Sequence, residues 1–175
     1  DGAVNASLHI NQGALYTIDT ILVYGDIKIA KSFLTHFLDI EEHSIYQQDK
    51  LDRINKRLSE LPFLVQTQPY SVSMLNTGAE LKLYLEARKS NQVNVLVGFQ
   101  PSNQQVGGKL LLTGEANLNL RNPFGNGETI GINWQQLQQK SPRLNLVYQR
   151  PYMFNSPVGV NVNFELYKRD SFFLN

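Results

Sequence analysis

The sequence predicts an α+β domain with elements in the order β-α-α-β-β, followed by antiparallel strands of a transmembrane β-barrel. Two observations lead to this fold class. Residues 1–89 hold 20 of the 31 charged side chains, whereas Asn and Gln supply 22 of the 86 residues that follow. In that second part apolar and polar residues alternate over segments of about ten residues, the strand length that crosses a bilayer.

Composition limits the classes of protein. A chain of 175 residues forms one domain or two small ones. A net charge of +1 gives no reason to expect nucleic acid, and the absence of cysteine excludes disulfides, thiol nucleophiles and zinc fingers. No apolar run approaches ~18 residues, so no transmembrane helix is expected. The charged fraction of 18% is low, because soluble domains hold about 25%.

Two strands are expected before the first helix. Residues 3–10 alternate between apolar and polar side chains, and we expect residues 1–12 to be the tail strand of a preceding domain. A turn at residues 11–13 follows. The second strand holds four apolar residues with a one-residue phase shift in their middle: Tyr16, Ile18, Ile21 and Val23.

Helical spacing then replaces alternation. Apolar residues recur at intervals of three and four over residues 28–38, which predicts a first helix. A second, longer helix is expected over residues 47–61, because its apolar residues fall on one stripe. Pro62 ends it, since proline cannot donate the next helical hydrogen bond. That stripe consists of Leu51, Ile54, Leu58 and Leu61.

Two strands complete the domain, over residues 64–75 and 79–87, joined by a turn at Asn76-Thr77-Gly78. Pro69 places the first of these strands at a sheet edge or at a bulge. An edge strand exposes unpaired backbone groups and can accept an extended peptide from another chain. The residues expected to bind such a partner are Leu64, Val65, Gln66, Thr67 and Gln68.

Alternation continues through residues 90–175. In the first segment one face holds Val93, Val95, Val97 and Phe99, and the other holds Asn94, Leu96 and Gly98. Similar segments recur, so five to six strands are expected. The later segments cover residues 110–120, 129–135, 144–149 and 160–167, with the beginning of a sixth at 171–174.

Two interpretations of these strands compete. A soluble β-sandwich also has one apolar and one polar face, but its strands average about 5–6 residues and its wet face usually carries Lys, Glu and Thr. Longer strands with an uncharged polar face favour the membrane interpretation. A membrane barrel needs at least about eight strands, because open edges cannot face lipid. The barrel is therefore expected to be incomplete within this sequence.

Several segments resemble a known family. The run from Leu15 to Asp26 resembles the opening strand of a POTRA domain, and the second helix stripe with Phe63 matches the helix that follows in such domains. Later segments resemble the start of the barrel in the BamA-like bacterial surface antigen superfamily. They are Gly98-Phe99, Leu112-Thr113-Gly114, the run from Asn122 to Glu128, and Pro151-Tyr152. The family's inward-loop motif, Val-Arg-Gly followed by Phe or Tyr, is absent from this sequence.

The resemblance implies a POTRA domain over residues 13–89 and the first strands of an outer-membrane β-barrel over residues 90–175. The function implied is assembly and insertion of outer-membrane proteins in Gram-negative bacteria. The POTRA domain would lie in the periplasm, bind unfolded client polypeptides through strand 64–75 and pass them to the barrel. Further partners implied are accessory periplasmic subunits or lipoproteins and outer-membrane lipid, with no nucleic acid and no cofactor.

Strand 91–100 would be the first barrel strand, which in this family pairs weakly and opens sideways. Gly98 is consistent with such a gate, although a bend or tight packing explains it equally well. The implied gate residues are Val93, Val95, Val97, Gly98 and Phe99. The implied periplasmic turn residues are Asn122, Pro123, Gly125 and Gly127.

Enzyme signals are weak. His9, His36 and His43 show no ligand spacing with carboxylates. Glycines at 107–108 and 125–127 lack the strand-to-helix context of a phosphate-binding loop. We therefore expect no catalytic residues, no metal and no enzyme activity. The alternatives to an assembly component are a two-partner secretion transporter and a soluble periplasmic protein-binding module.

Overall fold

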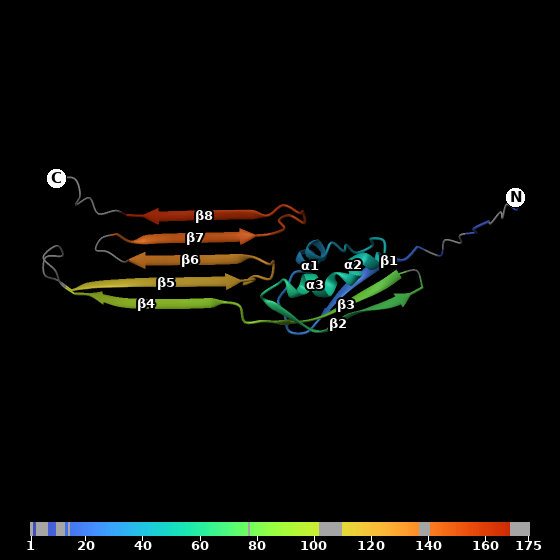
Figure 1. The fold of residues 1–175 in the computed structure, drawn as a ribbon, viewed down its shortest axis with the longest axis horizontal. Coiled ribbons are helices and arrows are strands. Elements are labelled where there is room, and N and C mark those ends of the chain that lie inside the picture. Colours follow the sequence, from blue (N-terminus) through green and yellow to red (C-terminus); the bar gives the residue numbers. More distant parts are fainter. Residues whose placement is uncertain are drawn as a thin grey trace.

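The computed structural model describes residues 2, 7–9, 13, 15–76, 78–101, 110–136 and 141–168. Two sheets lie end to end along the longest axis of the chain (Figure 1). The first sheet and its helices are built from β1 (Thr17–Tyr24), α1 (Lys31–Leu38), α2 (Gln48–Asp52), α3 (Ile54–Ser59), β2 (Leu64–Leu75) and β3 (Gly78–Ala87). The second sheet is built from β4 (Gln92–Gln100), β5 (Leu111–Arg121), β6 (Thr129–Gln136), β7 (Arg143–Arg150) and β8 (Val160–Tyr167).

Some of the expected elements are not observed as strands or lie outside the described residues. Residues 7–9 of the expected first strand are in no strand, and the rest of residues 3–10 lies outside the described residues. Thr77 of the expected turn and the start of a sixth strand at 171–174 also lie outside them.

The first sheet has the order β1-β3-β2 among the described residues, with β1 parallel and β2 antiparallel to the central β3. Parallel neighbours need a long connection, and the helices supply it. Leu81, Leu83 and Leu85 of β3 are fully buried under these helices. The apolar core also contains Ile18, Ile21, Leu34, Leu38, Ile54 and Leu58. The apolar face of β3 therefore packs in the core of the first domain.

The register of β1 shifts between Ile18 and Thr20. This confirms the phase shift in its apolar pattern. The outer edge of β1 is covered by residues 43–46, where the Ile18 N–H donates to the Ser44 carbonyl at 2.9 Å and the Tyr46 N–H donates to the Tyr16 carbonyl at 2.9 Å. Because β1 is covered in this way, β2 is the edge of the first sheet that remains open among the described residues.

Both helix predictions need correction. The first helix begins at Lys31 rather than near residue 28, because Ala30 is extended with φ −73° and ψ 133°. The predicted single helix over 47–61 is wrong, since α2 and α3 are separated at Arg53. The Arg53 N–H bonds the carbonyl three residues back, at Lys50, which tightens the helix there. The observed order is β-α-α-α-β-β.

The second sheet is an antiparallel meander with the order β4-β5-β6-β7-β8. The five predicted strands are confirmed, with continuous register in every pair. Its first and last strands are open edges within the part of the chain that the structure describes. None of the described helices is long and apolar enough to cross a membrane.

Candidate functional site

The edge strand β2 presents its predicted partner-binding residues unequally. Leu64 is buried in the core at 3% exposure, whereas Val65 is 46% exposed, and Thr67 and Gln68 are also exposed. The Gln66 side chain donates from Nε2 to Asn55 Oδ1 of α3 at 2.9 Å. Leu64 and Gln66 therefore fix β2 to the domain, while Val65, Thr67 and Gln68 are available on its surface.

Two register shifts interrupt β2. One lies between Gln66 and Gln68 and the other between Gln68 and Ser71. Thr67 has no partner in the β3 register, and Pro69 lies within the second shift, as expected for a residue that cannot donate to a ladder. After the shifts, Ser71 to Leu75 pair continuously with β3. The open edge thus consists of a regular part of three residues from Leu64 to Gln66, a short irregular part, and a second regular part of five residues.

The predicted gate residues lie on the open edge strand β4. Val93, Val95 and Val97 are exposed on one face at 67%, 69% and 59%. Phe99 is exposed on the same face. Gly98 faces Thr113 of β5, and a Cβ there would lie 2.8 Å from the Thr113 hydroxyl. Close packing against Thr113 therefore explains why glycine occupies this position.

One face of the second sheet is apolar from edge to edge. A single cross-strand row runs through Val93, Leu118, Ile132, Leu146 and Phe164. Its neighbouring row contains Val95, Trp134, Leu144 and Leu166, and side chains in both rows are exposed. Exposed apolar surface of this extent is unusual for a soluble monomer.

The opposite face carries a row of carboxamides. Asn94, Asn117, Asn133 and Asn145 lie directly opposite one another on four successive strands, and Glu165 of β8 ends the row. The Asn133 side-chain N–H₂ donates to Asn117 Oδ1, and Asn117 donates to Glu115 Oε1 at 2.6 Å. Sequence analysis noted the abundance of Asn but missed this row, which becomes visible when the strands are aligned in register.

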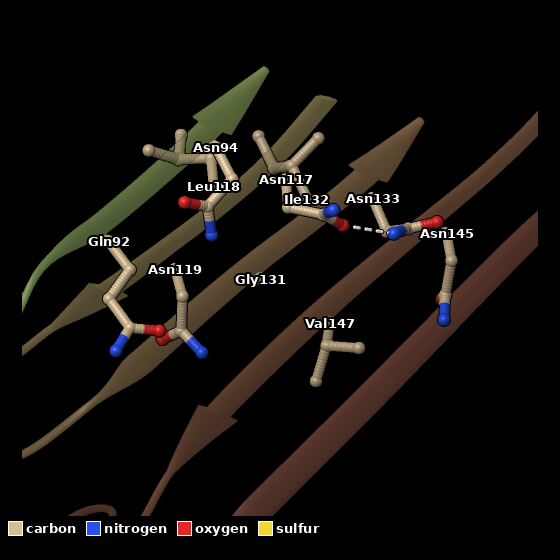
Figure 2. Close-up of a pocket in the computed structure, with 10 residues that line it drawn as sticks. All are labelled: Gln92, Asn94, Asn117, Leu118, Asn119, Gly131, Ile132, Asn133, Asn145 and Val147. Carbon is tan, nitrogen blue, oxygen red and sulfur yellow. Dashed lines mark hydrogen bonds between the residues drawn. The ribbon is translucent and has the colours of Figure 1, made fainter. Parts of the chain in front are cut away.

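A shallow hollow of about 220 Å³ lies on this polar face (Figure 2). Its base is at Gly131, between Asn119 and Val147 in the next cross-strand row, where no side chain fills the space. The buried oxygens Asn119 Oδ1 and Asn145 Oδ1 have no hydrogen-bond partner within the described part of the chain. A water-filled environment would satisfy both atoms.

The predicted turn residues lie between β5 and β6. Asn122, Gly125 and Gly127 have positive φ angles of 55°, 94° and 73°, which explains why Asn and Gly occupy these positions. The Gly127 N–H donates to Asn122 Oδ1 at 2.8 Å, and the Asn122 N–H donates to the Glu128 carbonyl at 2.7 Å. Pro123 follows Asn122 in the same turn.

Sequence analysis included Glu128 at the end of a run that resembles the family but gave it no role. It is 1% exposed, the one charged side chain that is buried in the described part of the chain. Its carboxylate accepts from the Asn126 N–H at 2.8 Å and from the Phe124 N–H. Charge-assisted bonds of this kind offset the cost of burying a carboxylate. A glutamate that follows a Gly-Asn-Gly turn was the signal that could have identified it.

The described residues contain no group of three or more His, Asp or Glu side chains placed to hold a metal ion. The features that can act chemically are instead backbone edges and surfaces. They are the β2 edge, the β4 edge, and a sheet with one apolar and one carboxamide face. Exposed backbone edges can form hydrogen bonds, and an exposed apolar face can be buried against another apolar surface.

No protein-family model and no curated protein sequence matches the chain. Solved structures do match. A crystal structure of BamA from Haemophilus ducreyi lacking POTRA domains 1–3 is similar with a TM-score of 0.59 and 20% identity. CdiB from Acinetobacter baumannii gives a TM-score of 0.48 and 16% identity.

Each of these matches covers 86% of this chain and 28% of the other chain. The chain therefore spans little more than a quarter of the length of the structures it matches. The similarity to BamA extends over both sheets for most of the described residues, and at 20% identity it is a similarity of fold. The chain has the fold of a part of BamA.

Proposed function

We propose that this chain is part of an outer-membrane protein assembly and insertion component, with the first sheet and its helices forming a periplasmic POTRA domain. The observation that carries the proposal is the second sheet. It exposes a continuous apolar face on one side and a polar face rich in carboxamides on the other, as strands between lipid and a wet lumen do. The fold similarity to BamA supports the same conclusion.

In this proposal β4 to β8 are the first barrel strands, and the two edges of the sheet pair with further strands in the membrane. The lengths of β4 and β5, 9 and 11 residues, match the roughly 9–11 residues of a tilted strand that crosses a bilayer. The strands β6, β7 and β8 have 8 residues each, just below that range. The carboxamide face then lines the lumen, where water satisfies Asn119 and Asn145. The turn at residues 122–128 lies on the periplasmic side with the POTRA domain.

The client enters by pairing with β2. Its exposed edge offers backbone donors and acceptors to any extended segment, so recognition does not depend on one client sequence. Val65 lies on the surface of the first regular part, Thr67 and Gln68 lie on the surface of the irregular part, and Ser71 to Leu75 form the second regular part. The β4 edge is where an inserted strand leaves the protein for lipid. No cofactor takes part, because burial of the client's apolar surface drives insertion.

The membrane placement is tested by flotation of the chain with liposomes of bacterial outer-membrane phospholipids. The chain is expected to float with the vesicles through its apolar face, and heat-dependent migration on gels is expected only where further strands close the barrel. A chain that stays in the aqueous fraction as a folded monomer would contradict the barrel assignment and favour the soluble periplasmic binding module.

The edge-strand role is tested with Thr67→Pro, because Thr67 has no partner in the β3 register and the domain can tolerate the change. A photoreactive side chain at Val65 reports contact with an unfolded eight-stranded outer-membrane protein diluted from urea. Crosslinking should fall about fivefold, since a lost backbone hydrogen bond is worth about 1 kcal/mol. Lys89→Pro in the exposed connection after β3 is the matched control. Equal crosslinking by both folded variants would sink the proposed binding edge.

A further inference from the structure

The turn between β5 and β6 is held in shape by hydrogen bonds between its own residues. The Glu128 carboxylate holds the Phe124 and Asn126 N–H groups, while the Asn122 side chain holds the Gly127 N–H. These bonds all lie within residues 122–128. A turn fixed by its own side chains presents a defined surface, because little conformational entropy is left to lose on contact.

That surface meets the segment before α1. The Ala30 N–H donates to the Gly125 carbonyl at 2.6 Å, and Asn122 Nδ2 donates to the Lys28 carbonyl at 3.0 Å. Ala30 is the N-cap of α1 and has no side chain to bond the first helical N–H groups. The turn thus bonds the backbone that leads into α1, at the N–H of its N-cap residue and at the Lys28 carbonyl.

The two glycines of the turn permit this contact. A Cβ on Gly127 would lie 2.1 Å from Cε2 of Phe33, and a Cβ on Gly125 would lie 3.1 Å from the Lys28 carbonyl oxygen. The first distance is impossible without displacing the Phe33 ring, which belongs to the core of the first sheet. The turn therefore approaches α1 as closely as glycine allows.

The next turn on the same side, between β7 and β8, makes a second contact. The Tyr152 ring lies 5.8 Å from the Phe33 ring and 5.5 Å from the His36 ring, measured between centroids. Aromatic pairs at these separations are attractive beyond their buried area. Two turns at the same end of the second sheet therefore lie against α1 (Figure 1).

We infer that the β5–β6 turn is a preformed docking element that fixes the first domain to β5–β8, with Glu128 as its positioning residue. The fixed contacts come from the turns that follow β5 and β7, and β4 is joined to the domain through residues 88–91. The domain and β5–β8 then move as one body, and β4 stays paired with β5 along its whole length, with the Asn91 side chain accepting from the Arg121 N–H at 2.8 Å. The inference concerns this contact and stands independently of any client.

The absence of cysteine makes the contact measurable. Nitroxide labels on Lys56→Cys in α3 and Asn161→Cys in β8, both exposed positions, report the distance between domain and sheet by double electron–electron resonance. The chain in detergent micelles should give one narrow distance distribution. Glu128→Ala should widen it about twofold or more, because domains without a firm interface move freely. Glu128→Gln keeps one acceptor oxygen and should give an intermediate width.

Further variants separate docking from folding. Gly127→Ala and Tyr152→Ala retain the Glu128 side chain and should also widen the distribution. Gly131→Ala is the matched glycine control, since its Cβ would meet Val147 at an ordinary 3.4 Å. If Glu128→Ala fails to fold, the two other variants still decide the question. A broad distribution in the unaltered chain, or unchanged narrow distributions in Glu128→Ala or in both Gly127→Ala and Tyr152→Ala, would overturn the inference.

Discussion

The strands β3 and β4 have the same alternating pattern and opposite environments. Leu81, Leu83 and Leu85 of β3 are fully buried, while Val93 and Val95 of β4 are about two-thirds exposed. The difference lies in what covers the apolar face. Helices α1 and α3 cover β3, whereas nothing in the described part of the chain covers β4. Alternation in a sequence therefore shows that a strand has two faces, and it does not show which medium each face meets.

Among the variants that test this contrast, Leu83→Ala on β3 should have the largest effect on stability. Removing a fully buried leucine side chain leaves a cavity and should destabilise the first domain by about 2–5 kcal/mol. Hydrogen exchange of the chain in detergent micelles measures this, resolved by region. Val95→Ala on β4 is the matched control and should leave protection of the first domain unchanged. A loss below about 1 kcal/mol for Leu83→Ala would mean that the core is not packed as described.

The exposure of β4 should be tested with Val95→Lys. If lipid covers this face, a lysine near the middle of the bilayer costs about 2–4 kcal/mol and should greatly reduce flotation with liposomes. Asn94→Lys, one residue away on the carboxamide face, is the control and should have little effect. Equal effects of the two lysines would indicate that the two faces meet the same solvent.

Sequence patterns predicted the elements that depend on local periodicity. The phase shift between Ile18 and Ile21 correctly indicated an irregularity in β1, and Pro69 correctly indicated a bulged edge strand. The helix over residues 47–61 was wrong because its apolar stripe continues across Arg53 although the backbone tightens there. Periodicity reports which side chains face the core and is insensitive to a single altered hydrogen bond.

The site was harder to predict because its parts come from distant segments. The carboxamide row depends on how four strands align, and a shift of one residue would send those side chains to the other face. Glu128 acts on backbone groups two and four residues away, which leaves no repeat to detect. The roles of Val65, of the β4 residues and of the turn stay predictions, although the structure places each of them.

A smaller effect is expected from the carboxamide row, which tests whether the two sheets respond separately. Asn133→Ala removes the bond to Asn117 in the middle of the row and should destabilise the second sheet by about 0.5–1 kcal/mol. Hydrogen exchange of β5 and β6 in micelles measures the loss. Asn94→Ala, at the exposed edge of the same row, should change less. Protection lost in the first domain as well would mean that the two sheets do not respond separately.

The smallest expected effect is a pH dependence confined to the first domain. Lys31 Nζ lies 2.5 Å from Glu42 Oε1, and this oxygen also accepts from the Ile21 N–H at 3.1 Å and the Thr20 hydroxyl at 3.0 Å. These groups, Lys31 first, lower the pKa of Glu42 from 4.5 to about 2. A lowered carboxyl pKa stabilises the fold above pH 4.5, and this stabilisation is lost as the pH falls towards about 2.

Because the Glu42 side chain is one-third exposed, solvent screening should limit the contribution to about 0.5 kcal/mol. Unfolding of the first domain by urea, followed in the unaltered chain and in Glu42→Gln, should differ by that amount at pH 6 and converge near pH 2. Glu41→Gln is the adjacent control. Because Glu42 bonds the β1 backbone from the segment that covers its edge, protection of β1 should fall with pH before that of β5 or β6 does. A pH response that is equal in both sheets would show that the charge network of the first domain does not set its stability separately from the second.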